Sequence, residues 1–66
     1  MTENIADALV KEIKRNQELL EAYRDIPTGV FGATMIKADI DFAVDALAGG
    51  DVVEILKAYK RMVNNE

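Results

Sequence analysis

Residues that commonly perform catalysis are scarce in this sequence. Its 66 residues include no histidine, no cysteine and no serine. The usual general bases and nucleophiles are therefore reduced to carboxylates, lysines and the hydroxyls of threonine and tyrosine. The sequence accordingly predicts a protein that is not an enzyme and that needs no cofactor.

The nearest approach to a metal-binding cluster is Asp39, Asp41 and Asp45. On a helix, Asp39 and Asp41 are about 200° apart and point to opposite sides. The segment also lacks the glycine turn and terminal glutamate of a calcium loop. We therefore predict no metal site. Asp39 is expected in a structural ion pair or at a water-exposed gap in a subunit interface, with contact to a partner or ligand as the alternative.

The segment TGVFGAT, residues 28–34, is the best candidate for holding a ligand. Its glycines permit close backbone approach, and a helix beginning here offers free N–H groups to an anion. It matches neither GxGxxG nor GxxxxGK, so the alternative is that Phe31 inserts into the core while the glycines shape a turn. The candidate ligand-binding residues are Tyr23, Arg24, Thr28, Gly29, Phe31, Gly32 and Lys37.

Helical periodicity dominates the elements that must position these residues. The spacing of apolar residues predicts a helix over about 3–25, capped by Thr2 or Asn4 and ended by Pro27. A second helix is predicted over about 29–48, capped by Thr28. Gly49 and Gly50 should supply its left-handed end.

A third helix is predicted over about 51–63, because Asp51 and Glu54 resemble a capping box ahead of an amphipathic pattern. The fold class is therefore all-α, with residues 1–66 forming one domain: a helical hairpin plus a third helix. Chains this short usually need a further source of stability, and self-association is the expected one.

The second predicted helix also favours self-association, because its apolar residues cover two faces instead of one. Such a helix is normally buried between two neighbours, either in its own chain or in a second chain. The candidate oligomer interface is Met35, Ala38, Asp39, Phe42 and Ala46. Asn16, which interrupts the apolar face of the first helix, is expected either to fix the register of a dimer or to lie at the rim, bonded to nearby backbone.

The charge balance limits the classes of partner. Twelve acidic and eight basic side chains give a net charge of −4, which disfavours non-specific binding to duplex nucleic acid. The sequence also lacks a long apolar run and an export-type leader. We therefore expect a cytoplasmic protein that does not bind membranes.

Three segments together resemble small, uncharacterised helical proteins of tailed phages and prophages: KEIKRNQELLEAY, GVFGATMIKADI and GDVVEILKAYKRM. This resemblance covers most of the chain and carries packing and capping patterns, with no catalytic or ligand residue to transfer. It implies an accessory protein that acts by binding in the host bacterial cytoplasm, as anti-CRISPR proteins and other antagonists of host defence do.

Two functions follow as hypotheses. The first is a homo-oligomeric, non-catalytic inhibitor or modulator of a host defence protein. The alternative is an oligomer that sequesters a nucleotide or another anionic signalling ligand at subunit contacts. A structural component of the virion is a third and weaker interpretation.

Overall fold

The computed structural model describes residues 3–65, and these residues form three helices and no strand. The helices are α1 (Ile5–Arg24), α2 (Val30–Gly49) and α3 (Val52–Val63). The all-α prediction is confirmed, and every predicted boundary lies within two residues of the observed one. That agreement follows because most of the signals that start and stop these helices are local.

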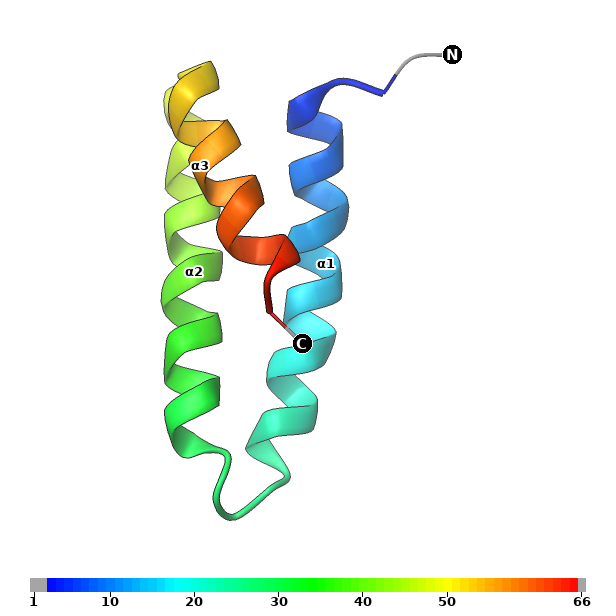
Figure 1. Cartoon of the computed structure of the whole chain (residues 1–66), viewed down its shortest axis with the longest axis vertical. Helices are drawn as coiled ribbons and strands as arrows, with labels where there is room; N and C mark the ends of the chain where they lie inside the picture. The colour runs from blue at the N-terminus through cyan, green and yellow to red at the C-terminus, as the bar shows by residue number, and fades with distance from the viewer. Residues whose placement is uncertain (1–2, 66) are drawn as a thin grey trace.

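The two long helices form an antiparallel hairpin, and the shorter α3 returns across it to contact both (Figure 1). The described chain measures 39 × 23 × 16 Å. The third helix has 12 residues, whereas α1 and α2 have 20 each. It therefore covers only the half of the hairpin that holds the start of α1 and the end of α2. The half nearest the α1–α2 connector therefore consists of two helices without a third.

Side chains and backbone cap most helix ends as the sequence predicts. Asn4 accepts a hydrogen bond from the Asp7 N–H through its Oδ1 atom (2.8 Å), whereas Thr2 lies outside the described residues. Asp51 caps α3 by accepting from the Val53 N–H at 2.9 Å. Gly50 adopts the left-handed conformation, with φ of 71°, and closes α2.

The expected cap of α2 is wrong. Gly29, not Thr28, is the residue that precedes the first turn, and no side chain caps it. The Gly29 N–H donates to the Ile26 carbonyl oxygen (2.8 Å), so a tight backbone turn leads directly into the helix. Thr28 is left exposed on that turn.

The core lies between all three helices. Ile36, Ile40 and Ala43 of α2 are buried, and so is Ala46, which is 6% exposed. The expectation that Ala46 belongs to an intersubunit face is therefore wrong: the chain's own helices bury it. The complete set of buried apolar residues is Leu9, Leu20, Ile36, Ile40, Ala43, Ala46, Ile55, Ala58 and Met62.

None of the three helices in the described chain is long and apolar enough to cross a membrane.

Candidate binding groove and exposed apolar rows

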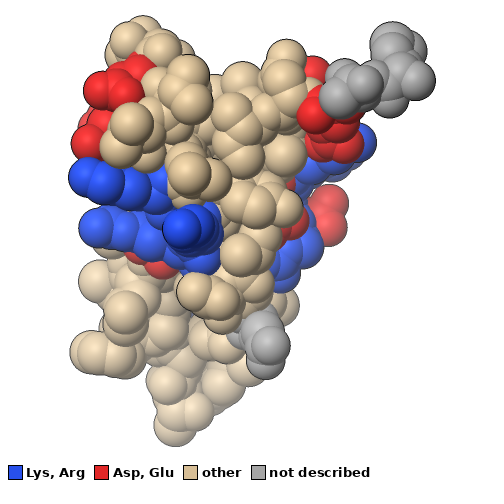
Figure 2. Space-filling view, turned by 45° about the horizontal axis from the view of Figure 1, so that its top comes forward, with Lys and Arg blue, Asp and Glu red and all other residues tan. Residues whose placement is uncertain are grey.

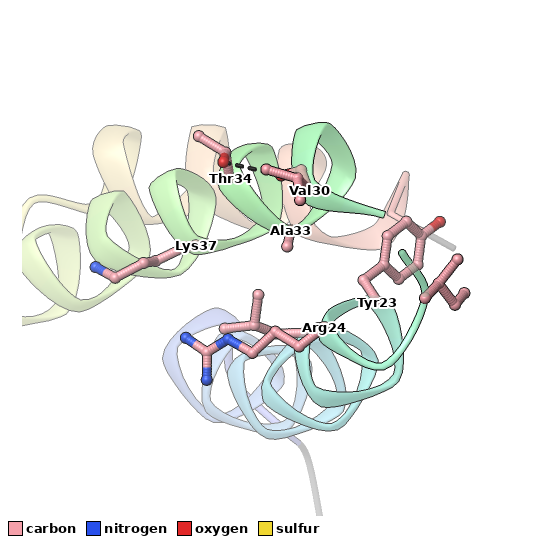
Figure 3. A pocket seen from close by; sticks show the side chains of 8 residues that line it. Tyr23, Arg24, Val30, Ala33, Thr34 and Lys37 are labelled. Atoms are coloured by element: carbon pink, nitrogen blue, oxygen red, sulfur yellow. Dashed lines mark hydrogen bonds between the residues drawn. The ribbon is translucent and has the colours of Figure 1, made fainter. Parts of the chain in front are cut away.

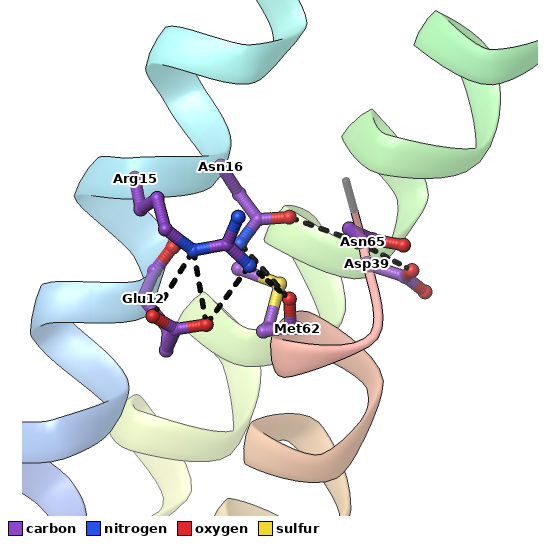
Figure 4. A network of polar contacts seen from close by, with 6 residues as sticks. All are labelled: Glu12, Arg15, Asn16, Asp39, Met62 and Asn65. Carbon is purple, nitrogen blue, oxygen red and sulfur yellow. Dashed lines mark hydrogen bonds and ion pairs between the residues drawn. The ribbon is translucent and has the colours of Figure 1, made fainter.

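A network of polar side chains attaches the end of α3 to α1 (Figure 4). The Arg15 Nη2 atom donates to the carbonyl oxygen of Met62 at 2.7 Å, and the same guanidinium pairs with Glu12 at 3.0 Å. Because the Met62 carbonyl lies in the last turn of α3, the arginine places positive charge at the negative end of that helix. This arrangement stabilises the position of α3.

Asn16 is the buried centre of this network. Its Nδ2 atom donates to the carbonyl oxygens of Glu12 (2.8 Å) and Met62 (3.3 Å), and its Oδ1 atom accepts from Asn65 at 2.9 Å. Asn16 is fully buried within one chain. The expected bonds to nearby backbone are therefore present. The side chain itself lies in the interior of one chain, neither at the rim nor between two chains.

Asp39 lies at the edge of the same network. Its Oδ2 atom accepts a hydrogen bond from the amide of Asn65 at 3.1 Å, and the side chain is half-buried. The partner is an amide instead of a cation, so the expected ion pair is wrong. The contact links α2 to the residues that follow α3, which is a structural role.

A groove of about 260 Å³ lies between the end of α1 and the start of α2 (Figure 3). Its apolar surface is flanked by two cations, Arg24 from α1 and Lys37 from α2, which point toward the same end of the groove. Arg24 pairs with Glu21 (3.1 Å) and Lys37 with Asp41 (3.0 Å). Exposed pairs of this kind contribute about 1 kcal/mol or less, so both cations are able to turn toward an anion.

Three of the seven predicted ligand residues meet in this groove: Tyr23, Arg24 and Lys37. The predicted ligand residues omitted five lining residues, of which three lie within the candidate segment 28–34 and two, Leu20 and Ile26, lie outside it. The missed residues are Leu20, Ile26, Val30, Ala33 and Thr34. Their only signal was proximity to the connector, since two helices that meet at a short turn must face each other there.

The other four predicted ligand residues lie elsewhere. Thr28 is exposed on the connector and Gly29 is buried in it. Gly32 packs beneath the ring of Tyr23 and lines a separate hollow of about 300 Å³. Phe31 is 78% exposed, so the alternative that it inserts into the core is also wrong.

Phe31 begins an apolar row along α2, here called the α2 row: Phe31, Met35, Ala38 and Phe42. The first three are exposed, and Phe42 is half-buried, with the guanidinium of Arg61 lying 4.3 Å from its ring centroid. Met35, Ala38 and Phe42 were among the predicted interface residues. Successive spacings of 4, 3 and 4 place all four side chains on one side of the helix.

A second exposed apolar row, the α3 row, consists of Val52, Leu56 and Val63, which are 64%, 43% and 42% exposed. Lys60 stands four residues after Leu56 and three before Val63, so it adjoins both on the helix surface. Figure 2 shows Lys and Arg side chains gathered beside uncharged surface on the face that carries α3. The row thus combines an apolar centre with a basic edge.

Within the described part of the chain, no group of three or more His, Cys, Asp or Glu residues could hold a metal ion.

Comparison with known proteins gives no match among protein-family models, curated proteins or solved structures.

Proposed function

We propose that this chain is a non-catalytic, homo-oligomeric protein that inhibits or modulates another protein by direct contact through the α3 row. The observation that carries the proposal is the exposure of Val52, Leu56 and Val63 beside Lys60. Exposed apolar side chains bordered by charge are typical of protein interaction sites.

The chemistry of the row favours an acidic, amphipathic segment as its occupant. Leu56 and Val63 lie on one side of α3 at a spacing of seven residues, which suits apolar side chains repeating along a partner helix. Lys60, between them, would meet a carboxylate at the edge of that helix. The source proposed for this segment is a host protein of the bacterial cytoplasm, such as a defence protein.

Leu56→Asp should reduce at least tenfold the amount of the host polypeptide, the target, that is recovered after cross-linking to this chain. The change removes an apolar contact worth about 1.5–3 kcal/mol and sets a carboxylate against an acidic segment. Val10→Asp is the matched control, because Val10 is a similarly exposed apolar residue on α1. The measurement is in-cell cross-linking in a bacterial host, followed by quantitative mass spectrometry of the captured polypeptides.

Equal recovery with Leu56→Asp and Val10→Asp would contradict the α3 row as the contact surface. Capture of no polypeptide other than the chain itself would contradict target binding as a whole.

Sequestration of an anionic ligand is the second candidate function, and the groove flanked by Arg24 and Lys37 favours it. A nucleotide at about 100 times its Kd should stabilise the chain by about 2.7 kcal/mol, which raises Tm by about 10 °C or more in a domain this small. Arg24→Gln should abolish that rise. Lys11→Gln, which removes another exposed and ion-paired cation, should leave it intact.

A thermal-shift panel of linear and cyclic nucleotides provides the measurement. Absence of any shift, or an equal shift in the Arg24→Gln and Lys11→Gln variants, would remove this candidate.

A further inference from the structure

The α2 row has the spacing of a helix-pairing seam. Steps of 4, 3 and 4 residues match the a and d positions of a heptad repeat, at which apolar side chains of one helix pack between those of another. Most of the row is uncovered because α3 reaches only its Phe42 end, where Arg61 lies over the ring. The α3 row is a different surface, so target binding would leave the α2 row available.

We propose that the α2 row pairs with the same row of a second copy of this chain, in antiparallel orientation. The inference rests on the self-association included in the proposed function, and it specifies the surface and the register. With the two-fold axis between residues 36 and 37, Phe31 lies opposite Phe42 of the second copy. Met35 then lies opposite Ala38 of the second copy.

Side-chain size supports this register. Met35 and Ala38 combine a large residue with a small one, so two helices approach closely without an overfilled centre. Phe31 and Phe42 combine two aromatic rings at each end of the seam, a favourable pair beyond its buried area. Arg61, already 4.3 Å from the Phe42 ring centroid, would lie at the edge of that aromatic pair.

Charge supports the antiparallel orientation over the parallel one. The seam continues to Asp45, three residues after Phe42. A parallel pair would place Asp45 opposite Asp45 of the second copy, and like charges at directly facing positions are unfavourable. The antiparallel register places Asp39 opposite Thr34 and Asp45 beyond the start of α2 of the second copy, so no two carboxylates face each other.

The first test is the mass of the chain in solution, measured by sedimentation equilibrium. The unchanged chain should be a dimer, and Met35→Asp should be a monomer with its far-UV circular dichroism retained. Met35 is 54% exposed, so the substitution leaves the core intact. Val44→Asp adds the same charge to a similarly exposed apolar residue, 50% exposed, on the opposite side of α2 from the row, and should leave the dimer intact. A monomeric unchanged chain, or a Met35→Asp dimer, would overturn the proposal.

Disulfide trapping tests the register, because the chain contains no cysteine of its own. Equal amounts of Phe31→Cys and Phe42→Cys, mixed and oxidised, should form a mixed dimer identified by its summed mass. Phe31→Cys alone should form little dimer, because two copies of that position would lie about 16 Å apart along the helix axis. Efficient linkage of Phe31→Cys alone would indicate parallel pairing and overturn the proposal.

The first cysteine pair removes the two aromatic rings of the proposed contact, so a second pair that retains them is needed. Met35→Cys mixed with Ala38→Cys should also form the mixed disulfide, and failure of both mixtures would contradict the register. The two proposals fail separately: a dimer whose Leu56→Asp variant captures as much target as the unchanged chain supports this pairing but not the α3 contact. A monomeric chain whose Leu56→Asp variant loses target capture supports the α3 contact but not this pairing.

Discussion

Gly29→Ala should destabilise the chain by about 3 kcal/mol, toward the upper end of the cost of overpacking. A β-carbon at this position would collide with the carbonyl oxygen of Tyr23 and lie 3.1 Å from the carbonyl oxygen of Ile26. Both obstacles are backbone atoms, one in the last turn of α1 and one in the connector, so no side-chain rotation relieves the contact. The connector itself must shift, and with it the angle at which α2 leaves α1.

The matched control is Gly49→Ala. Gly49 is the last residue of α2, and a β-carbon there meets nothing within 4 Å. Alanine should therefore stabilise the chain slightly, by about 0.5–1 kcal/mol, through its higher helix propensity. Urea unfolding followed by circular dichroism measures both variants. Equal stability of Gly29→Ala and the unchanged chain would show that the connector accommodates a side chain.

The helices could be predicted from the sequence because their signals are local. The Asn4 and Asp51 caps, the left-handed Gly50 and the Pro27 connector each depend on a few neighbouring residues. These signals specify where a helix begins and ends, and which of its faces is apolar.

Which apolar faces are buried and which stay exposed could not be predicted, because this depends on where α3 crosses the hairpin. Ala46 and Phe31 occur on the same helix, yet α3 lies over the part of α2 that contains Ala46 and stops short of the part that contains Phe31. The length of α3 relative to the hairpin decides this difference. No local sequence pattern indicates which part of α2 the third helix will cover.

The candidate groove was partly predictable for the same reason. Arg24 and Lys37 were recognised as cations near the connector, whereas the apolar wall arises from the packing of the hairpin. Thr28 was expected to cap α2, but a backbone turn, in which the Gly29 N–H donates to the Ile26 carbonyl oxygen, makes Gly29 the residue before the helix and leaves Thr28 exposed. In a chain of 66 residues, one such turn decides which side chains share a surface.

A second large effect is expected at Asn16, where polar groups fix the position of α3 on the hairpin. Asn16→Asp keeps the size of the side chain but replaces its donating amide with a second acceptor oxygen. That oxygen would face the carbonyl oxygens of Glu12 and Met62, which now receive hydrogen bonds from Asn16. The result is a buried charge in which one oxygen faces two acceptors, while the other keeps the hydrogen bond from the Asn65 amide. Arg15, bonded to the same Met62 carbonyl, offsets part of the cost.

Asn16→Asp should therefore lose about 3–5 kcal/mol at pH 7, enough to unfold much of a domain this small. Burial raises the pKa of the new carboxyl in the folded chain, so its neutral form is favoured there. The folded state then binds more protons than the unfolded state. The loss of stability relative to the unchanged chain should therefore shrink on acidification and grow as pH rises.

Asn16→Leu is the control, because it removes the same hydrogen bonds without a titrating group. Urea unfolding of all three chains at pH 3 and pH 7 measures the difference; a deficit independent of pH would mean that the carboxylate at position 16 reaches water, and that Asn16 does not hold the closed core found here.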